Sequence, residues 1–175
     1  MNFDEILDEI PDDLNELNWE DQGLVGQFKL DLKKEGVEIT QERGNSCILK
    51  KGEVSVAVLV YQYTPQNRHT EYEGFWDVGQ QMFERMQRKK EEIGRDWGVA
   101  FLLGTFKETT LNGSFWVTSE DFRRDRAKLS LDSNNRYKVN LQDLEDRCLS
   151  NEKFSTVGDF LRLSGLNPTG SKGEG

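Results

Sequence analysis

Apolar residues dominate both faces of an extended segment at residues 53–63. The segment is rich in β-branched and aromatic residues and contains neither Gly nor Pro, which is typical of a strand. One face carries Val54, Val56, Val58 and Val60, and the other carries Ala57, Leu59, Tyr61 and Tyr63. A strand that is apolar on both faces is buried on both sides. Residues 97–106 have the same character, so the sequence predicts two central strands.

Helical spacing of apolar residues predicts two longer helices. Residues 21–35 form the first, and Gly36 ends it because Gly tolerates the left-handed conformation after a helix. Residues 71–93 are predicted as the longest helix, with an apolar stripe, a polar remainder and Gly94 as its stop.

Shorter patterns complete the predicted elements. Strands are expected at residues 37–41, from Cys47 to Leu49, and at residues 114–118, where Asn112-Gly113 is a strong hairpin signal. Helices are expected to begin at residue 119 and to cover 141–148 and 154–163, the last with Ser155 or Thr156 as N-cap. Residues 123–140 are charged and rich in turn formers.

The order of these elements predicts an α+β fold with a central mixed sheet flanked by helices. Residues 21–166 are expected to form a single domain, for which the length is sufficient to bury a core. Residues 1–20 form an acidic amphipathic segment ahead of it, and residues 167–175 form a tail without packing residues.

The charge imbalance of the chain lies entirely in its first segment. The net charge is −9, but residues 1–21 contain nine of the 32 acids and none of the 23 bases, so the remainder is neutral. Apolar residues recur there at helical spacing, and the candidates for partner binding are Phe3, Ile6, Leu7, Ile10 and Trp19. This segment either docks on the protein's own core with a solvated acidic face, or meets a basic partner or covers a basic surface.

Composition narrows the functional classes. No apolar run approaches the roughly 20 residues that span a bilayer, and the acidic N-terminus lacks the basic region of a signal peptide. Cys47 and Cys148 have no metal or redox spacing, which favours reduced thiols in a cytoplasmic protein. No nucleotide-binding fingerprint occurs, so no cofactor is expected.

The order helix, three strands, helix, two strands and helix over residues 21–125 resembles the core of the PD-(D/E)XK nuclease superfamily. That superfamily includes restriction endonucleases and archaeal Holliday-junction resolvases. In it, an Asp opens one strand and a Glu-x-Lys follows on the next, about a dozen residues later. The resemblance implies a divalent metal held by the two carboxylates, and a Lys that helps to activate the attacking water.

The positions that correspond to this motif hold no carboxylate. The spacing places Cys47 in the Asp position, Leu59 in the Glu position and Tyr61 in the Lys position. A shift of one residue offers Ile48, Val60 and Gln62, and a hard divalent ion prefers oxygen ligands that neither set supplies as a pair. No metal site is therefore predicted there. Relocated carboxylates are the alternative, and the candidates are Glu38, Glu42 and Asp77, the last placed early in the long helix.

Two groups of basic residues are candidates for contacts with nucleic acid. The first lies on the second half of the long helix and comprises Arg85, Arg88, Lys89 and Lys90; the second comprises Arg123, Arg124 and Arg126. Such clusters bind phosphates through counterion release. Both are interleaved with acids, so a solvated, salt-bridged surface is the alternative interpretation.

The sequence thus favours a non-catalytic binding or accessory protein that acts through protein contacts and does not associate with membranes. Components of nucleic-acid machinery are one class of candidate partner. The alternatives are a divalent-metal-dependent nuclease with relocated active-site residues and a DNA-binding module that does not cleave. The resemblance also implies a homodimer, because relatives of this core often form dimers.

Overall fold

The chain was analysed as a computed structural model that describes residues 23–42, 44–63, 75–103 and 113–167. The α+β class and the mixed central sheet are confirmed. The sheet has six strands in the order β1-β2-β3-β5-β6-β9. Their bounds are Glu38–Gln41 for β1, Ser46–Lys51 for β2, Val54–Tyr63 for β3, Trp97–Leu103 for β5, Ser114–Thr118 for β6 and Glu152–Phe154 for β9.

The first three strands form an antiparallel meander, and β5 lies parallel to β3. A parallel neighbour needs a crossover connection, and the helix α4 (Gln80–Ile93) lies in it. Strands β6 and β9 extend the sheet in antiparallel fashion. The two strands predicted as central are therefore central in the structure.

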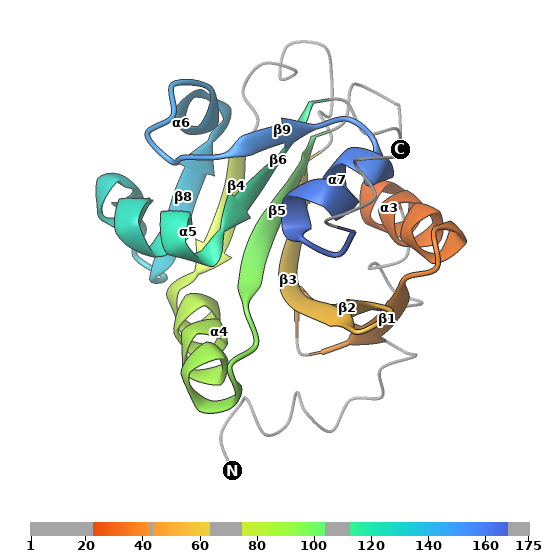
Figure 1. The fold of residues 1–175 in the computed structure, drawn as a ribbon. Coiled ribbons are helices and arrows are strands. Elements are labelled where there is room, and N and C mark those ends of the chain that lie inside the picture. The colour runs from red at the N-terminus through yellow and green to blue at the C-terminus, as the bar shows by residue number, and fades with distance from the viewer. Residues whose placement is uncertain (1–22, 43, 64–74, 104–112, 168–175) are drawn as a thin grey trace.

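One face of this sheet is covered by the helices α3 (Gly23–Lys34) and α7 (Val157–Ser164) (Figure 1). Phe28 of α3 and Phe160 of α7 meet edge to face with ring centroids 5.0 Å apart. Trp116 of β6 packs edge to face on Phe160 as well. The indole of Trp116 covers Gly98 of β5, so this position has no room for a side chain.

The opposite face is covered by α4, α5 (Ser119–Asp125) and a second sheet of three strands (Figure 1). That sheet has the order β4-β8-β7, with β4 at Phe75–Gly79, β8 at Arg136–Asn140 and β7 at Ser130–Leu131. The 3-10 turn η3 (Arg126–Lys128) and the short helix α6 (Leu141–Glu145) border it. Phe83 of α4, Trp97 of β5 and Phe122 of α5 form the aromatic centre of this layer.

The helix predicted over residues 71–93 is wrong in its first part. Residues 75–79 form β4, and α4 begins only at Gln80, after an extended Gly79. Strand β4 pairs with β8, about 60 residues further along the chain. Asp77 therefore lies on a strand, opposite Lys138, and not on the long helix.

Two further expectations need adjustment. Phe154, predicted as the first residue of a helix, ends β9 instead. Helix α7 begins at Val157, and its N-cap is Thr156, one of the two candidates. The charged region 123–140 contains η3 and the β7–β8 hairpin besides its turns. Residues 1–21, with their partner-binding candidates, and Asn112 lie outside the described ranges.

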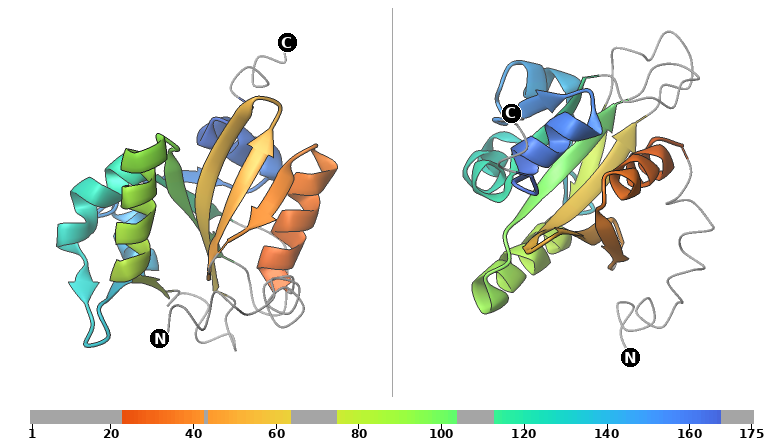
Figure 2. Two further views of the ribbon diagram at one scale, coloured as in Figure 1. Left: turned by 90° about the horizontal axis from the view of Figure 1, so that it is seen from below. Right: turned by 45° about the vertical axis from the view of Figure 1, so that its right-hand side comes forward.

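None of the described elements covers the α4 side of the large sheet at its β1–β2 end. Thr40 and Lys50 are exposed there and Ile48 is half-buried, whereas the α3 side of the same strands contributes to a buried core. Figure 2 shows α4 and α3 on opposite sides of the sheet. Among the described helices, none is long and apolar enough to cross a membrane.

Candidate functional site

The β2–β3 hairpin brings together the two strands on which the nuclease motif would lie, but in a register that differs by one residue from the predicted spacing. Ser46 lies opposite Leu59, and Cys47 lies opposite Val58. Since neighbouring residues on a strand point to opposite faces, Cys47 points into the α3 core while Leu59 and Tyr61 face the α4 side. The structure therefore unites two of the three motif positions and separates Cys47 from them.

The α4 side of the hairpin is lined by apolar and hydroxyl groups. Its residues are Ser46 and Ile48 on β2, and Ala57, Leu59 and Tyr61 on β3. Leu59 is completely buried. Burial raises the pKa of the Tyr61 phenol, and the charge of Arg85 offsets this only in part. Tyr61 is therefore a neutral hydroxyl at neutral pH.

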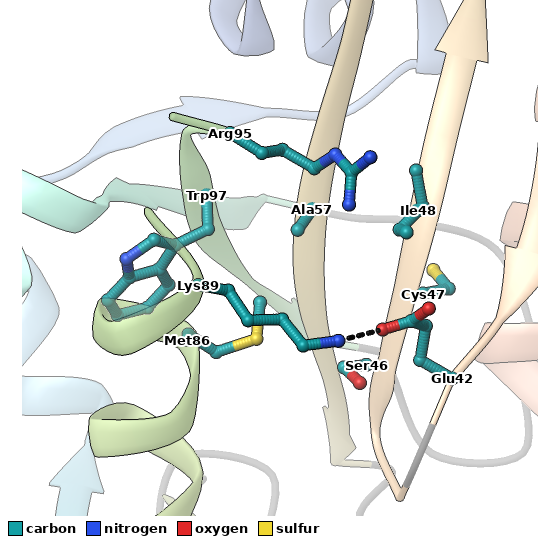
Figure 3. Close-up of a pocket in the computed structure, with 9 residues that line it drawn as sticks. All are labelled: Glu42, Ser46, Cys47, Ile48, Ala57, Met86, Lys89, Arg95 and Trp97. Carbon is teal, nitrogen blue, oxygen red and sulfur yellow. Dashed lines mark hydrogen bonds and ion pairs between the residues drawn. The ribbon is translucent and has the colours of Figure 1, made fainter. Parts of the chain in front are cut away.

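A shallow pocket lies between this hairpin face, α4 and the start of β5 (Figure 3). Its open volume, which includes solvent at the mouth, is about 290 Å³. The lining residues are Glu42, Ser46, Cys47, Ile48, Ala57, Met86, Lys89, Arg95 and Trp97. The pocket thus combines apolar walls with three charged side chains.

Glu42 is fixed at one side of the pocket by the turn after β1. The side-chain amide of Gln41 donates to the backbone carbonyls of Glu42, Gly44 and Ser46, at 3.1 Å each. The backbone N–H of Glu42 donates to the Ser46 carbonyl at 2.9 Å and closes the turn. The Glu42 carboxylate then accepts a hydrogen bond from the Lys89 ammonium of α4 at 3.0 Å.

Arg95 contributes a second cation from the connection between α4 and β5. Gly94 ends α4 in the left-handed conformation, at φ 74°, and the chain then turns toward β5. The Arg95 side chain reaches across Ala57 toward Ile48 (Figure 3). Within the described part of the chain, Arg95 forms no hydrogen bond or ion pair. Two cations and one carboxylate therefore leave the pocket with a charge of about +1.

The carboxylates proposed as relocated metal ligands are not brought together. Glu38 lies at the start of β1, opposite Lys50, and Glu42 is paired with Lys89. Asp77 lies on β4 with its Oδ1 3.7 Å from the Lys138 ammonium. Among the described residues, no group of three or more His, Cys, Asp or Glu side chains is arranged to hold a metal ion.

Comparison with known proteins gives a likeness of fold. No family model matches the sequence, and no curated protein does. The structure is similar to that of Hjc, a Holliday junction resolvase from the archaeal hyperthermophile Archaeoglobus fulgidus, with a TM-score of 0.46 and 10% sequence identity. The alignment covers 81% of this chain and 93% of the resolvase chain.

The predicted basic candidates on α4 differ in how much of their charge is available. Lys89 faces the pocket and is paired with Glu42. Lys90 lies 3.3 Å from Asp96 and donates to the Ser119 hydroxyl. Arg85 donates to the Met82 sulfur at 3.2 Å, and Arg88 is exposed.

The second basic group is mostly engaged in contacts within the protein. Arg124 pairs with Asp121 and Asp125, and Arg126 donates to the Tyr137 hydroxyl at 2.6 Å while lying over the Phe83 ring. Arg123 is exposed. Arg124 therefore fits the alternative interpretation, in which the basic residues belong to a solvated, salt-bridged surface.

Sequence reasoning missed Arg95 and Ser46. Arg95 belongs to no motif, and its only sequence signal is its place between a helix stop and a buried strand. Ser46 directly precedes the strand predicted from Cys47 to Leu49. Its position opposite Leu59 follows from the register, which spacing alone does not fix.

Proposed function

We propose that this chain is a non-cleaving binding protein on a nuclease-like core, and that the α4 side of the β2–β3 hairpin is its contact surface. The observation that carries the proposal is the identity of the paired residues there. Ser46 stands opposite Leu59, and Ile48 stands opposite Ala57. At these two pairs the side chains that face α4 are one hydroxyl and three hydrocarbons, and Ile48 and Ala57 are the half-buried ones.

The chemistry of these groups favours contact over catalysis. A divalent ion that activates water needs oxygen ligands with negative charge, and the buried Leu59 side chain offers none. The one carboxylate of the pocket, Glu42, is neutralised by Lys89 at 3.0 Å. Half-buried apolar groups beside a cation suit the recognition of another protein.

A cleavage assay tests this proposal. The full chain is incubated with Mg²⁺ or Mn²⁺ and with branched, single-stranded and duplex DNA. We expect no cleavage above the level of a Glu42→Gln variant prepared in the same way. Because Glu42 is the only carboxylate lining the pocket, this variant is the matched control.

Metal-dependent cleavage that is lost in Glu42→Gln, Glu38→Ala or Asp77→Ala would overturn the proposal. It would establish the alternative of a nuclease with relocated carboxylates. Cleavage that survives all three substitutions would point to a contaminating nuclease. A further purification step would remove it, and the assay would be repeated on the purified chain.

A second candidate function is nucleic-acid binding without cleavage, and Arg95 is the observation that favours it. Its guanidinium is half-buried and faces the pocket without an acidic partner among the described residues. An unpaired guanidinium can contact a phosphate, and such binding weakens steeply with salt. In fluorescence anisotropy at low salt, Arg95→Gln should weaken DNA binding, whereas Lys33→Gln on α3 should not. Equal affinities for the two variants would exclude this site.

A further inference from the structure

In the pocket beside α4, the Arg95 guanidinium has no partner among the described residues, and residues 1–21 of the same chain contain acids but no base. Arg95 and Lys89 give the pocket its positive charge, and only Glu42 opposes them. Residues 1–21 contain nine acids and no Lys or Arg, while residues 22–175 are neutral as a whole. The acidic segment and the pocket are therefore complementary in charge.

The apolar character of the two partners also matches. The pocket offers Ile48 and Ala57 near the Arg95 guanidinium, and Met86 from α4. The segment alternates acids with apolar residues at helical spacing, so that one side is apolar and is flanked by carboxylates. The apolar residues are Phe3, Ile6, Leu7, Ile10, Leu14 and Leu17. Such a segment can pack its apolar side on the pocket while a flanking carboxylate meets Arg95.

The chain is long enough for this contact. Helix α3 is attached at the far end of β3, where the backbone N–H of Val25 donates to the Gln62 side chain at 3.1 Å. The path from Gln62 to Ala57 is about 17 Å along the strand, and passing to the other face adds about 10 Å. A helix over residues 3–17 spans about 22 Å, and residues 18–22 in extended form add about 17 Å, so the segment is still longer than that path.

We propose that residues 1–21 bind in cis to the pocket formed by the β2–β3 hairpin, α4 and Arg95, and so occupy the contact surface until a partner displaces them. The inference rests on the proposed function, because it assigns an occupant to the same surface. Covalent attachment gives the segment a local concentration of order 1 mM. A segment with a dissociation constant of about 0.1 mM is then bound about nine-tenths of the time.

Hydrogen exchange of the full chain, followed by mass spectrometry at low ionic strength, tests the contact. Residues 3–17 should exchange about tenfold more slowly than in a synthetic peptide of residues 1–21. Arg95→Glu should return the exchange to the rate of the peptide. Lys33→Glu reverses the same charge on α3, across the sheet, and should leave the protection unchanged. Adding Glu5→Lys and Glu9→Lys to Arg95→Glu should restore part of the protection.

Three outcomes would overturn the inference. The first is exchange of the wild-type segment at the rate of the free peptide. The second is protection that persists in Arg95→Glu, which would place the segment elsewhere. The third is protection that disappears on dilution, which would assign the pocket to the segment of a second copy. Exchange of β3 amides reports in each variant whether the core is folded.

The two proposals fail separately. DNA cleavage dependent on Glu42 would overturn the proposed function without changing the exchange of residues 3–17. Unprotected exchange of residues 3–17 in the wild type would exclude residues 1–21 as the occupant of the pocket. It would not change the result expected in the cleavage assay.

Discussion

Asp125 is the clearest case in which a single buried charge stabilises the described fold. Its side chain is 2% exposed, at the end of α5. Oδ1 accepts from Arg124 Nε at 3.0 Å, and Oδ2 accepts from Arg124 Nη2 at 3.1 Å and from the Ser150 backbone N–H at 3.0 Å. The Lys128 ammonium lies 3.5 Å from Oδ1. This network joins α5 to the segment that leads into β9.

We expect Asp125→Asn to lower the free energy of unfolding by about 2 kcal/mol at neutral pH. The amide conserves volume and can still accept from Ser150, so the loss is confined to the charge-assisted bonds. Hydrogen bonds to a charged group contribute about 1.5–3 kcal/mol, and solvent at the exposed end of the bridge reduces that value. A loss of about 2 kcal/mol lowers the melting temperature of a chain of this size by about 4–8 °C.

The pH dependence follows from the direction of the pKa shift. The hydrogen bonds from Arg124 hold the pKa of Asp125 well below its usual range, although burial opposes them. In the unfolded chain the pKa is about 3.9. The stabilisation is thus complete above about pH 5 and decreases below it, by about 1.4 kcal/mol per pH unit once the unfolded carboxyl is protonated. Near pH 2.5 about 2 kcal/mol is lost, and the two proteins should become almost equally stable.

Urea unfolding of both proteins at pH 7 and pH 2.5, followed by circular dichroism, measures these differences. Asp121→Asn is the matched control, because Asp121 pairs with the same Arg124 at 3.0 Å from a position 28% exposed. Its effect should stay below about 1 kcal/mol at both pH values. A difference between wild type and Asp125→Asn that is equally large at pH 2.5, or absent at pH 7, would refute the reasoning.

Substitutions at three further positions test the packing and the helix capping on the α3 side of the sheet. Gly98→Ala should cost about 1–3 kcal/mol in urea unfolding, because the new Cβ would meet the Trp116 indole and lie 2.9 Å from the Val117 carbonyl. Gly158→Ala in α7 has room and should be neutral or stabilising, and equal effects of the two changes would contradict this. Thr156→Ala should cost about 1 kcal/mol by removing the N-cap of α7, while Thr156→Ser should restore stability.

Strand β4 shows why part of the fold was not predictable from local pattern. Residues 75–93 carry apolar residues at helical spacing, and α4 does use that pattern, since Phe83 and Met86 are buried. The first five residues pair instead with β8. Trp76 and Val78 are buried while Asp77 is half-buried, which is the alternation of a strand, but three residues are too few to outweigh the pattern that follows. The deciding contact is about 60 positions away.

The central strands were predictable for the opposite reason. Residues 54–63 and 97–103 are apolar on both faces, and their β-branched and aromatic residues favour a buried strand over a helix. This prediction does not depend on knowing which strands pair with them, because burial on both sides follows from the residues alone. The end of α4 was predictable likewise, since Gly94 adopts a left-handed conformation that other residues rarely take.

The candidate site lies between these two cases, because its elements were predictable and the direction of its side chains was not. A spacing of twelve residues pairs Cys47 with Leu59 only if the connecting turn has one particular length. The two-residue turn at Gly52-Glu53 instead sets Ser46 against Leu59, and Asn45 continues the pairing through two hydrogen bonds with Val60. One residue of register moves a side chain to the other face of the sheet. An acid at position 47 would therefore point into the α3 core, so a motif search by spacing alone would examine the wrong face of this hairpin.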